Sequence, residues 1–318
     1  MKAGEAAASA RDRLRAQPWG LAIAVIADGD QEILLEYGDD KFDEDTFFQI
    51  GSITKTMTGL LVADAVTRKE TSLDATVGSV LGDDAGNCAT VTLLNLITQH
   101  SGLPRLPPNL HLEQVDPKDP YASYTEADII EALRMVEPPS PKYGYSNFGF
   151  MLLGLLLGRI TGITYSELVR ERVFSQMGMN MALCGLPPEQ ERIPGYEESS
   201  QTPWWTTQLP GAGGIACGIK ELAQYVRSHL SPPDSLRSAV EMALAEHAPG
   251  PPVMGLGWLH QGGGHWHNGG TGGFHSFAAL HRGTNTGIAL LANSHDAESV
   301  DKVGFGVLTE LVRSRAAT

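Results

Sequence analysis

The sequence predicts an α+β (α/β) fold in which an antiparallel sheet is flanked by the N- and C-terminal helices and carries a large, mainly helical insertion. Apolar, strand-like runs occur at residues 21–27 and 31–37, and short strand-like runs return after residue 255. Because two strands are too few to be stable alone, the strands from both ends of the chain are expected to share one sheet. Between these regions the apolar pattern is helical.

A single domain with two subdomains is expected for residues 1–318. Hydrophobic residues make up 42% of the chain and charged residues 19%, which is typical of a globular protein with a sizeable core. We assign residues 1–51 and about 250–318 to a sheet subdomain, and about residues 52–249 to a helical subdomain.

The N-terminal segment predicts a short amphipathic helix followed by a hairpin. The first twenty residues lack the apolar stretch of a secretory signal, so we expect a cytoplasmic protein. The two strands that follow are separated by Asp28-Gly29-Asp30, a sequence that favours a tight turn.

Helical periodicity begins at Ser52. In residues 52–69, Met57, Leu60 and Leu61 fall on one helix face. Further helices are expected at residues 92–99, 125–136, 145–161, 165–174, 219–230 and 235–247. The second of these helices opens with Thr125-Glu126-Ala127-Asp128, a capping-box pattern.

Strand patterns return late in the chain. The expected strands lie at residues 255–260, 265–268, 273–281 and 287–293, and a helix around 300–313 closes the chain. The three cysteines, Cys88, Cys184 and Cys217, are widely spaced and odd in number, which favours buried thiols over a disulfide framework or a zinc site.

Nucleic acids and membranes are not expected as partners. The formal net charge of −14 repels phosphate backbones, and the only basic group, Arg11, Arg13 and Arg15, is short. The most apolar run, residues 148–157, is far shorter than the roughly 20 residues that span a bilayer, and predicts a buried core helix.

The first candidate for chemistry is the pair Ser52 and Lys55 at the start of a helix. Residues three apart share a helix face, so the lysine can reach the serine hydroxyl. A lysine with a lowered pKa can take the proton of a serine nucleophile, and the helix N-terminus favours the negative charge that develops. The alternative for these residues alone is a serine N-cap beside an exposed lysine.

A second candidate, Tyr145-Ser146-Asn147, precedes the most apolar helix. A phenol can relay a proton between nucleophile and leaving group, and an amide can donate to a substrate carbonyl. The alternative is a helix cap with a tyrosine packed beneath it.

The third candidate is the glycine-rich run from Trp266 to Phe274. Glycines in a strand admit a close backbone or ligand, and a backbone N–H can face a developing oxyanion. A phosphate-binding loop is disfavoured because no Gly-Lys-Ser/Thr follows. His265 and His267 share a strand face, but no HExxH motif or carboxylate cluster accompanies them, so no metal is expected. The remaining alternative is a hairpin turn without a chemical role.

Together, the order SxxK, YxN and HxG resembles the serine β-lactamase and penicillin-binding-protein superfamily. The resemblance is closest to its class C-like branch, which includes DD-peptidases and family VIII esterases. It covers most of the chain and rests on the blocks FQIGSITKTMTGLLVADAV, VTLLNLITQHSGLP, YGYSNFGFMLLG and WHNGGTGGFHSFAAL. It implies a β-lactamase/transpeptidase-like fold.

The resemblance also implies a role for each residue of the motifs. Ser52 is the acylated nucleophile, Lys55 receives or shares its proton, and Tyr145 assists as general base and acid. Asn147 would hold the substrate carbonyl. His267 stands where many relatives have a lysine, with Gly269, Gly270 and Thr271 beside it, and the N–H groups of Ser52 and Gly270 would form the oxyanion hole. No metal or organic cofactor is needed, and the GxSxG elbow of α/β-hydrolases is absent from the chain.

One departure bears on the substrate. Many β-lactamases carry Lys-Thr-Gly where this chain has His267-Asn268-Gly269. Because a histidine near pH 7 supplies less positive charge than a lysine, an anionic substrate should be bound less strongly.

The leading hypothesis is therefore a serine hydrolase or acyltransferase that acts on a small ester or amide through an acyl-Ser52 intermediate. The first alternative is a β-lactamase or D-alanyl-D-alanine carboxypeptidase, with a lactam or peptide substrate. The second is a catalytically silent binding protein of the same fold. Retention of Ser52, Lys55 and Tyr145 together speaks against the silent protein.

Four aromatic side chains are expected near the site entrance, where the resemblance places their loops. They are Tyr121, Tyr124, Trp204 and Trp205, for which ordinary packing is the alternative and the commoner outcome. Residues 211–214, Gly-Ala-Gly-Gly, are expected to form a tight loop next to the site.

Overall fold

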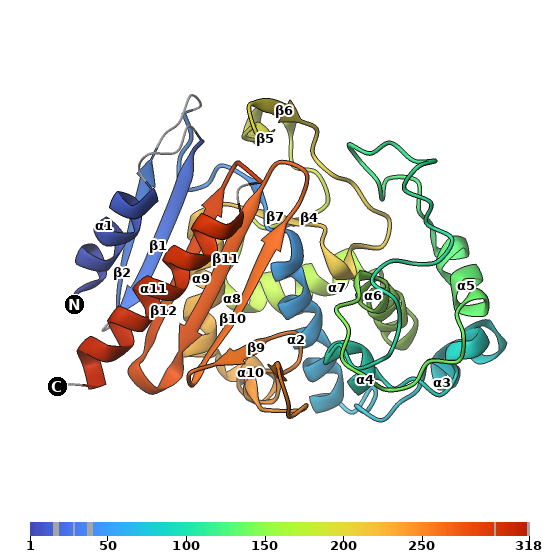
Figure 1. Ribbon diagram of the computed structural model, residues 1–318. Helices are drawn as coiled ribbons and strands as arrows, with labels where there is room; N and C mark the ends of the chain where they lie inside the picture. Colours follow the sequence, from blue (N-terminus) through green and yellow to red (C-terminus); the bar gives the residue numbers. More distant parts are fainter. Residues whose placement is uncertain (15–18, 28, 37–40, 296, 317–318) are drawn as a thin grey trace.

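The computed structural model describes residues 1–14, 19–27, 29–36, 41–295 and 297–316 (Figure 1). Asp28 of the expected turn, Tyr37 at the end of the expected second strand, and Arg15 lie outside the described residues.

The strands from both ends of the chain form one antiparallel sheet, as the sequence predicts. Its order is β2-β1-β12-β11-β10-β9-β8. The strands are β1 (Leu21–Ala27), β2 (Asp30–Glu36), β8 (Val253–Met254), β9 (Leu259–Gln261), β10 (Gly264–Gly270), β11 (His275–His281) and β12 (Thr286–Ala292). β1 pairs with β12 from Leu21 opposite Ala292 to Ala27 opposite Thr286, which joins the two ends of the chain.

Helices cover both faces of this sheet. α1 (Ala3–Leu14) and α11 (Ala297–Ala316) pack on one face, and α9 (Ile219–Leu230) packs on the other (Figure 1). Alternate residues of β1 serve the two layers: Ile23 and Val25 lie in the cluster with α1 and α11, while Ala22 and Ala24 lie in the main core. Both sets are apolar because this strand is buried on both faces.

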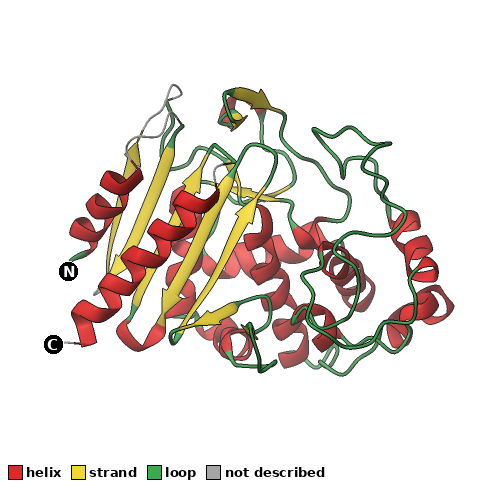
Figure 2. Cartoon of the chain, viewed as in Figure 1, coloured by secondary structure: helices red, strands yellow, loops and turns green. Residues whose placement is uncertain are grey.

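The other helices gather beside the sheet, as Figure 2 shows. They are α2 (Thr54–Thr67), α3 (Val77–Leu81), α4 (Leu93–Ile97), α5 (Glu126–Met135), α6 (Asn147–Thr161), α7 (Tyr165–Val169), α8 (Ser175–Met177) and α10 (Arg237–Leu244). Every residue of α2 from Thr54 to Ala65 is buried, so this helix is the centre of the molecule rather than an amphipathic surface helix.

Short strands interrupt the helical region. β3 (Phe48–Gln49), β7 (Ile215–Cys217) and β4 (Leu183–Cys184) form one small sheet, and β5 (Gly195–Glu197) pairs with β6 (Ser200–Thr202). β4, β5, β6 and β7 lie within residues 52–249, so this region is mainly, but not wholly, helical. One of its helices, α9, packs on the large sheet. The sequence did not predict the short strands because runs of two or three residues are too short to show a period of two.

Several expected boundaries moved for identifiable reasons. The helix expected from Tyr145 begins at Asn147, because Ser146 caps it by accepting a hydrogen bond from the Gly149 N–H. Most of the strand expected at residues 255–260 is a turn: β8 ends at Met254, β9 begins at Leu259, and the chain turns between them with Gly257 at φ +79°. The helix expected at 165–174 is α7 followed by a π turn, Arg170–Phe174.

All three cysteines are free thiols. Cys88 and Cys217 are buried, and Cys184 is half-buried. Burial raises the pKa of the Cys88 and Cys184 thiols to about 11. They are therefore poorly reactive near neutral pH.

Within the described residues, no single helix is long and apolar enough to cross a membrane. Only α6 taken together with residues 165–177 reaches that length and composition, and this pair is bent by 83°.

Candidate active site

Ser52 lies in a tight turn, Gly51–Ile53, that joins β3 to α2. Its hydroxyl does not cap the helix, and Lys55 is fully buried, so the alternative of an N-cap beside an exposed lysine does not hold. The Lys55 Nζ lies 2.8 Å from Ser52 Oγ and donates to the Ala212 carbonyl at 2.7 Å. The helix spacing therefore brings the amine to the hydroxyl.

Burial changes the chemistry of Lys55. It lowers the pKa of the Lys55 amine well below its ordinary value of 10.5, and the positive charge of Arg105 lowers it further. No acidic partner offsets these effects among the described residues. A lysine held in this way can take up the neutral form and accept a proton from Ser52.

Tyr145 approaches the same oxygen. Its Oη donates to Ser52 Oγ at 2.7 Å, and its ring lies 5.0 Å from Lys55 Nζ. Burial raises the pKa of the phenol, and the Ser52 hydrogen bond and the Arg105 charge offset this only in part. The phenol is therefore protonated and can donate a proton.

His267 extends from β10 toward Tyr145, with ring centroids 6.5 Å apart. Burial and then the nearby charge of Lys55 lower the pKa of His267 to about 3, while its contact with the Asn268 carbonyl acts in the opposite direction. His267 is neutral near pH 7, as the sequence argument assumed.

The turn that carries Ser52 fits closely against the end of β10. A Cβ at Gly269 would lie 2.0 Å from the Ile50 carbonyl oxygen and 2.9 Å from the Ser52 nitrogen, and a Cβ at Gly51 would lie 2.6 Å from the Gly270 nitrogen. Only glycine permits this approach. It brings the backbones of Ser52 and Gly270 together, where their N–H groups can serve one oxyanion.

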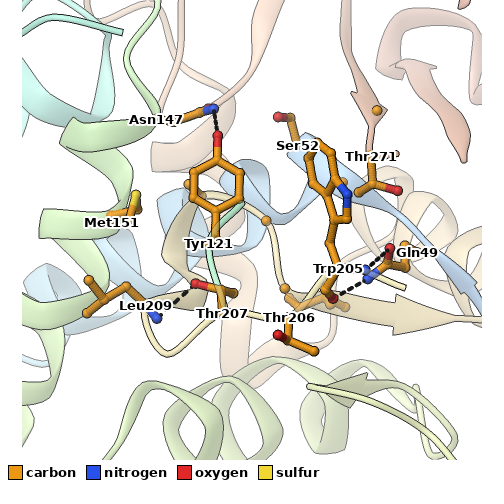
Figure 3. Close-up of a pocket in the computed structure, with 16 residues that line it drawn as sticks. Gln49, Ser52, Tyr121, Asn147, Met151, Trp205, Thr206, Thr207, Leu209 and Thr271 are labelled. Atoms are coloured by element: carbon orange, nitrogen blue, oxygen red, sulfur yellow. Dashed lines mark hydrogen bonds between the residues drawn. The ribbon is translucent and has the colours of Figure 1, made fainter. Parts of the chain in front are cut away.

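A pocket opens beside Ser52 (Figure 3). Its walls include Asn147 and Met151 of α6, Tyr121, Trp205, residues 206–207 and 212–214, Leu209, Gly270 and Thr271. Three buried polar atoms at this pocket have no hydrogen-bond partner among the residues that the structure describes: Asn147 Oδ1, Trp205 Nε1 and Thr271 Oγ1. Unpaired buried polar atoms of this kind are uncommon in folded proteins.

The four aromatic candidates divide into two pairs. Tyr121 and Trp205 line the pocket with ring centroids 5.8 Å apart, and Asn147 Nδ2 contacts Tyr121 Oη at 3.4 Å. Trp204 is buried against Phe274 and bonded to the Ile193 carbonyl, and Tyr124 is buried and bonded to Asn109. For this second pair, packing was the correct interpretation.

Behind the site, α11 forms hydrogen bonds with β10, which carries the third motif, His267-Asn268-Gly269, and with β11. Asp301 accepts a hydrogen bond from Asn268 Nδ2 at 2.6 Å and lies 2.9 Å from His275 Nε2. Asn268 therefore points away from the cleft, whereas its neighbour His267 points into it, as expected for successive residues of a strand.

Sequence reasoning missed several residues of this site. Gln49 and Asp119 hold the backbone of Trp205 and Thr206, Asp301 holds β10, and Arg105 lies 5.2 Å from the centre of the Tyr145 ring. Arg105 directly follows the SGLP block, which was the one available clue. His265 packs against His260 with ring centroids 4.5 Å apart. In the described part of the chain, no group of three or more His, Cys, Asp or Glu residues is arranged to hold a metal ion.

A buried lysine and a phenol that both reach one serine hydroxyl, beside an antiparallel sheet flanked by helices, define a serine hydrolase type of site. The family model described as Beta-lactamase matches residues 10–310, and the chain belongs to that family, which comprises serine hydrolases of the β-lactamase and DD-peptidase type. The fold and the family expected from the sequence are therefore confirmed.

The chain is similar to several characterised proteins. It is 27% identical to the "Beta-lactamase" of Escherichia coli (strain K12) over 256 residues, which cover 75% of this chain and 65% of that protein's length. It is 27% identical to "Penicillin-binding protein 4" of Amycolatopsis lactamdurans, with 88% and 82% covered. A β-lactamase/D-alanine carboxypeptidase from Pseudomonas syringae shares the fold with a TM-score of 0.83 at 19% identity, covering 96% of this chain and 97% of that one.

Proposed function

We propose that the protein is a serine hydrolase or acyltransferase that takes the acyl group of a small ester or amide onto Ser52 and passes it to water or another acceptor. The observation that carries the proposal is the double contact at Ser52 Oγ, which lies 2.8 Å from the buried Lys55 amine and 2.7 Å from the Tyr145 phenol.

In the acylation step, Ser52 Oγ attacks the substrate carbonyl while the neutral Lys55 amine takes its proton. The N–H groups of Ser52 and Gly270 hold the negative oxygen that forms. Tyr145 then gives its proton to the departing oxygen or nitrogen as the bond to the leaving group breaks, and the proton on Lys55 restores the phenol. Such proton transfers typically contribute about 10²–10⁴-fold to the rate.

In the second step, a water molecule or another nucleophile attacks the acyl-Ser52 carbonyl. Its proton passes to the Lys55 and Tyr145 pair, and the bond from the acyl carbon to Ser52 Oγ breaks. A proton returned from the same pair regenerates the hydroxyl. The reaction consumes no cofactor, and its protons balance over the two steps.

The neutral His267 favours an ester or amide as the substrate over a lactam antibiotic. It supplies no positive charge for a substrate carboxylate from β10, where many relatives place a lysine. The names of the similar proteins favour the alternative, a β-lactamase or D-alanyl carboxypeptidase.

The deciding experiment compares the hydrolysis of a short-chain p-nitrophenyl ester with that of a chromogenic cephalosporin. Both are assayed with the wild type and with Ser52→Ala. Ester turnover that is lost in Ser52→Ala, with little cephalosporin turnover, is the expected result. Fast cephalosporin turnover would establish the β-lactamase alternative. Failure of acylating probes to label Ser52, together with no turnover, would favour the silent binding protein.

A further inference from the structure

Arg105 places a positive charge at the site, on the side of Tyr145. Its guanidinium carbon lies 5.2 Å from the centre of the Tyr145 ring, and its side chain is exposed. Lys55 is buried with a lowered pKa, and His267 is neutral near pH 7. Since a guanidinium stays protonated, Arg105 is the permanent cation among these three groups.

The backbone fixes Arg105 relative to the second motif. The Arg105 carbonyl accepts hydrogen bonds from the N–H groups of Asn147 and Phe148, at 2.9 and 3.3 Å. The Ser146 hydroxyl also bonds to the Pro104 carbonyl at 2.7 Å. The backbone of Arg105 is therefore attached to the first turn of α6, within reach of Tyr145 for its side chain.

The Arg105 guanidinium makes no ion pair and no hydrogen bond with the described residues. Other arginines of this acidic chain do: Arg172 bonds to Glu70 and Asp64, and Arg134 bonds to Asp84. A guanidinium presents donors in a planar fork that matches a carboxylate. Beside Tyr145 this fork is open to a ligand.

The position of Arg105 indicates which part of a substrate it meets. In the proposed reaction the acyl group occupies the pocket beside Ser52. Gly270 and Asn147 line this pocket, whereas neither Arg105 nor Tyr145 is among its walls. In the reaction proposed above, Tyr145 delivers a proton to the leaving group. The leaving group therefore lies on the side of Arg105.

We propose that Arg105 forms a carboxylate-binding subsite on the loop before α6. The preferred substrates would then be acyl esters or amides whose alcohol or amine part carries a carboxylate. This inference rests on the proposed function, and it places the anion beside Tyr145 instead of on the β10 strand.

The test is a binding measurement that needs no turnover. The ligands are 3-(butanoylamino)benzoate and the uncharged butananilide, titrated calorimetrically into Ser52→Ala. We expect the benzoate to bind about tenfold more tightly, the size of one charge-assisted hydrogen bond. Adding Arg105→Gln to Ser52→Ala should abolish this difference in affinity between the two ligands, whereas Arg105→Lys should keep part of it. Salt at 0.5 M shortens the screening length and should therefore reduce the difference in affinity.

Arg134→Gln is the matched control, because it removes one exposed guanidinium elsewhere and changes the net charge equally. Arg134→Gln should leave the tighter binding of the benzoate unchanged. Equal binding of the two ligands, no binding of either, or a preference that survives Arg105→Gln would each overturn the subsite.

Kinetics separate this inference from the proposed function. With 4-nitrophenyl and 3-carboxy-4-nitrophenyl butanoate, Arg105→Gln should raise KM about tenfold more for the carboxylated ester than for the uncharged one. Any change in kcat should be the same for both esters, because the Arg105 charge also acts on the pKa values of Lys55 and Tyr145. An equal loss on both esters would overturn the subsite. Arg105-dependent binding by a wild type that hydrolyses neither ester would overturn the proposed function and support the subsite.

Discussion

Gln49 and Trp205 are joined by two hydrogen bonds. Gln49 Nε2 donates to the Trp205 carbonyl at 2.7 Å, and the Trp205 N–H donates to Gln49 Oε1 at 3.1 Å (Figure 3). Gln49 lies in β3, three residues before Ser52, so the serine and the indole wall of the pocket are held by the same short segment. Trp205 also packs on Gly272, where a Cβ would lie 2.6 Å from the indole nitrogen.

Gln49→Glu is expected to loosen the Trp205 wall. The new carboxylate has no N–H for the Trp205 carbonyl and repels it, while the reacting groups at Ser52 are untouched. We expect KM for p-nitrophenyl esters to rise about 5- to 10-fold, corresponding to about 1–1.4 kcal/mol, with a smaller change in kcat. Steady-state kinetics measure this. Gln201→Glu, an exposed change of equal charge, is the control, and an unchanged KM in Gln49→Glu would contradict the argument.

Replacing Lys55 by methionine separates activity from stability. Loss of the proton acceptor should lower kcat/KM by about 10³-fold or more. The folded-state pKa of Lys55 lies below its ordinary value of 10.5, so the unfolded chain binds the extra proton. This penalty on folding grows as the pH falls from 10.5 toward the folded-state pKa.

Lys55→Met removes that penalty, although it leaves the Ala212 carbonyl without its donor. We therefore expect a melting temperature equal to or above that of the wild type at pH 7, and a smaller difference at pH 10. Calorimetric scans at the two pH values test this. A variant that is inactive and also much less stable at pH 7 would show that Lys55 supports the fold.

The sheet could be predicted from local patterns because its strands are long enough to show them. Residues 21–27 and 287–293 are apolar runs, and the structure has β1 at Leu21–Ala27 and β12 at Thr286–Ala292. The capping box at Thr125 and Asp128 also marked a helix start correctly. By contrast, β3 and β7 are so short that only their pairing makes them strands.

The site could be predicted only in part, for a related reason. Ser52 and Lys55 are neighbours on one helix, so their contact follows from spacing. Gln49 and Trp205 meet across 156 positions. Gln49 stands in the same sequence block as Ser52, but nothing in that block indicates that Trp205 is its partner. The roles of Arg105 and Asp301 likewise depend on tertiary contacts that no local pattern encodes.

A buried histidine should make the protein sensitive to acid. His229 is fully buried against Tyr225 and Trp258, and burial lowers its pKa from 6.5 to about 4. Because the unfolded chain binds the proton first, stability is lost as the pH falls from about 6.5 toward 4, at about 1.4 kcal/mol per pH unit at most.

His229→Phe keeps the aromatic packing and cannot be protonated, so its urea-unfolding free energy should depend less steeply on pH between 6.5 and 4. The exposed His111→Gln is the control and should keep the slope of the wild type. Parallel pH profiles for His229→Phe and the wild type would refute this role for His229.

Asp301 should matter both for stability and for the reaction, although it lies outside the cleft. It is the shared acceptor for Asn268 of β10 and for His275 of β11, whose side chain is only 4% exposed. Asp301→Ala leaves both groups without this partner, which should lower the free energy of unfolding by about 1–3 kcal/mol. Because Asn268 lies between His267 and Gly269, the end of β10 that faces Ser52 should also become less well positioned, and kcat should fall while KM changes little.

Glu310→Ala on the same helix is the control. It removes only an exposed ion pair with Arg13, and it should lower the free energy of unfolding by less than about 1 kcal/mol without affecting kcat. Urea unfolding and ester kinetics on both variants decide the matter: an Asp301→Ala protein as stable and as active as Glu310→Ala would show that the contact with α11 does not support the third motif.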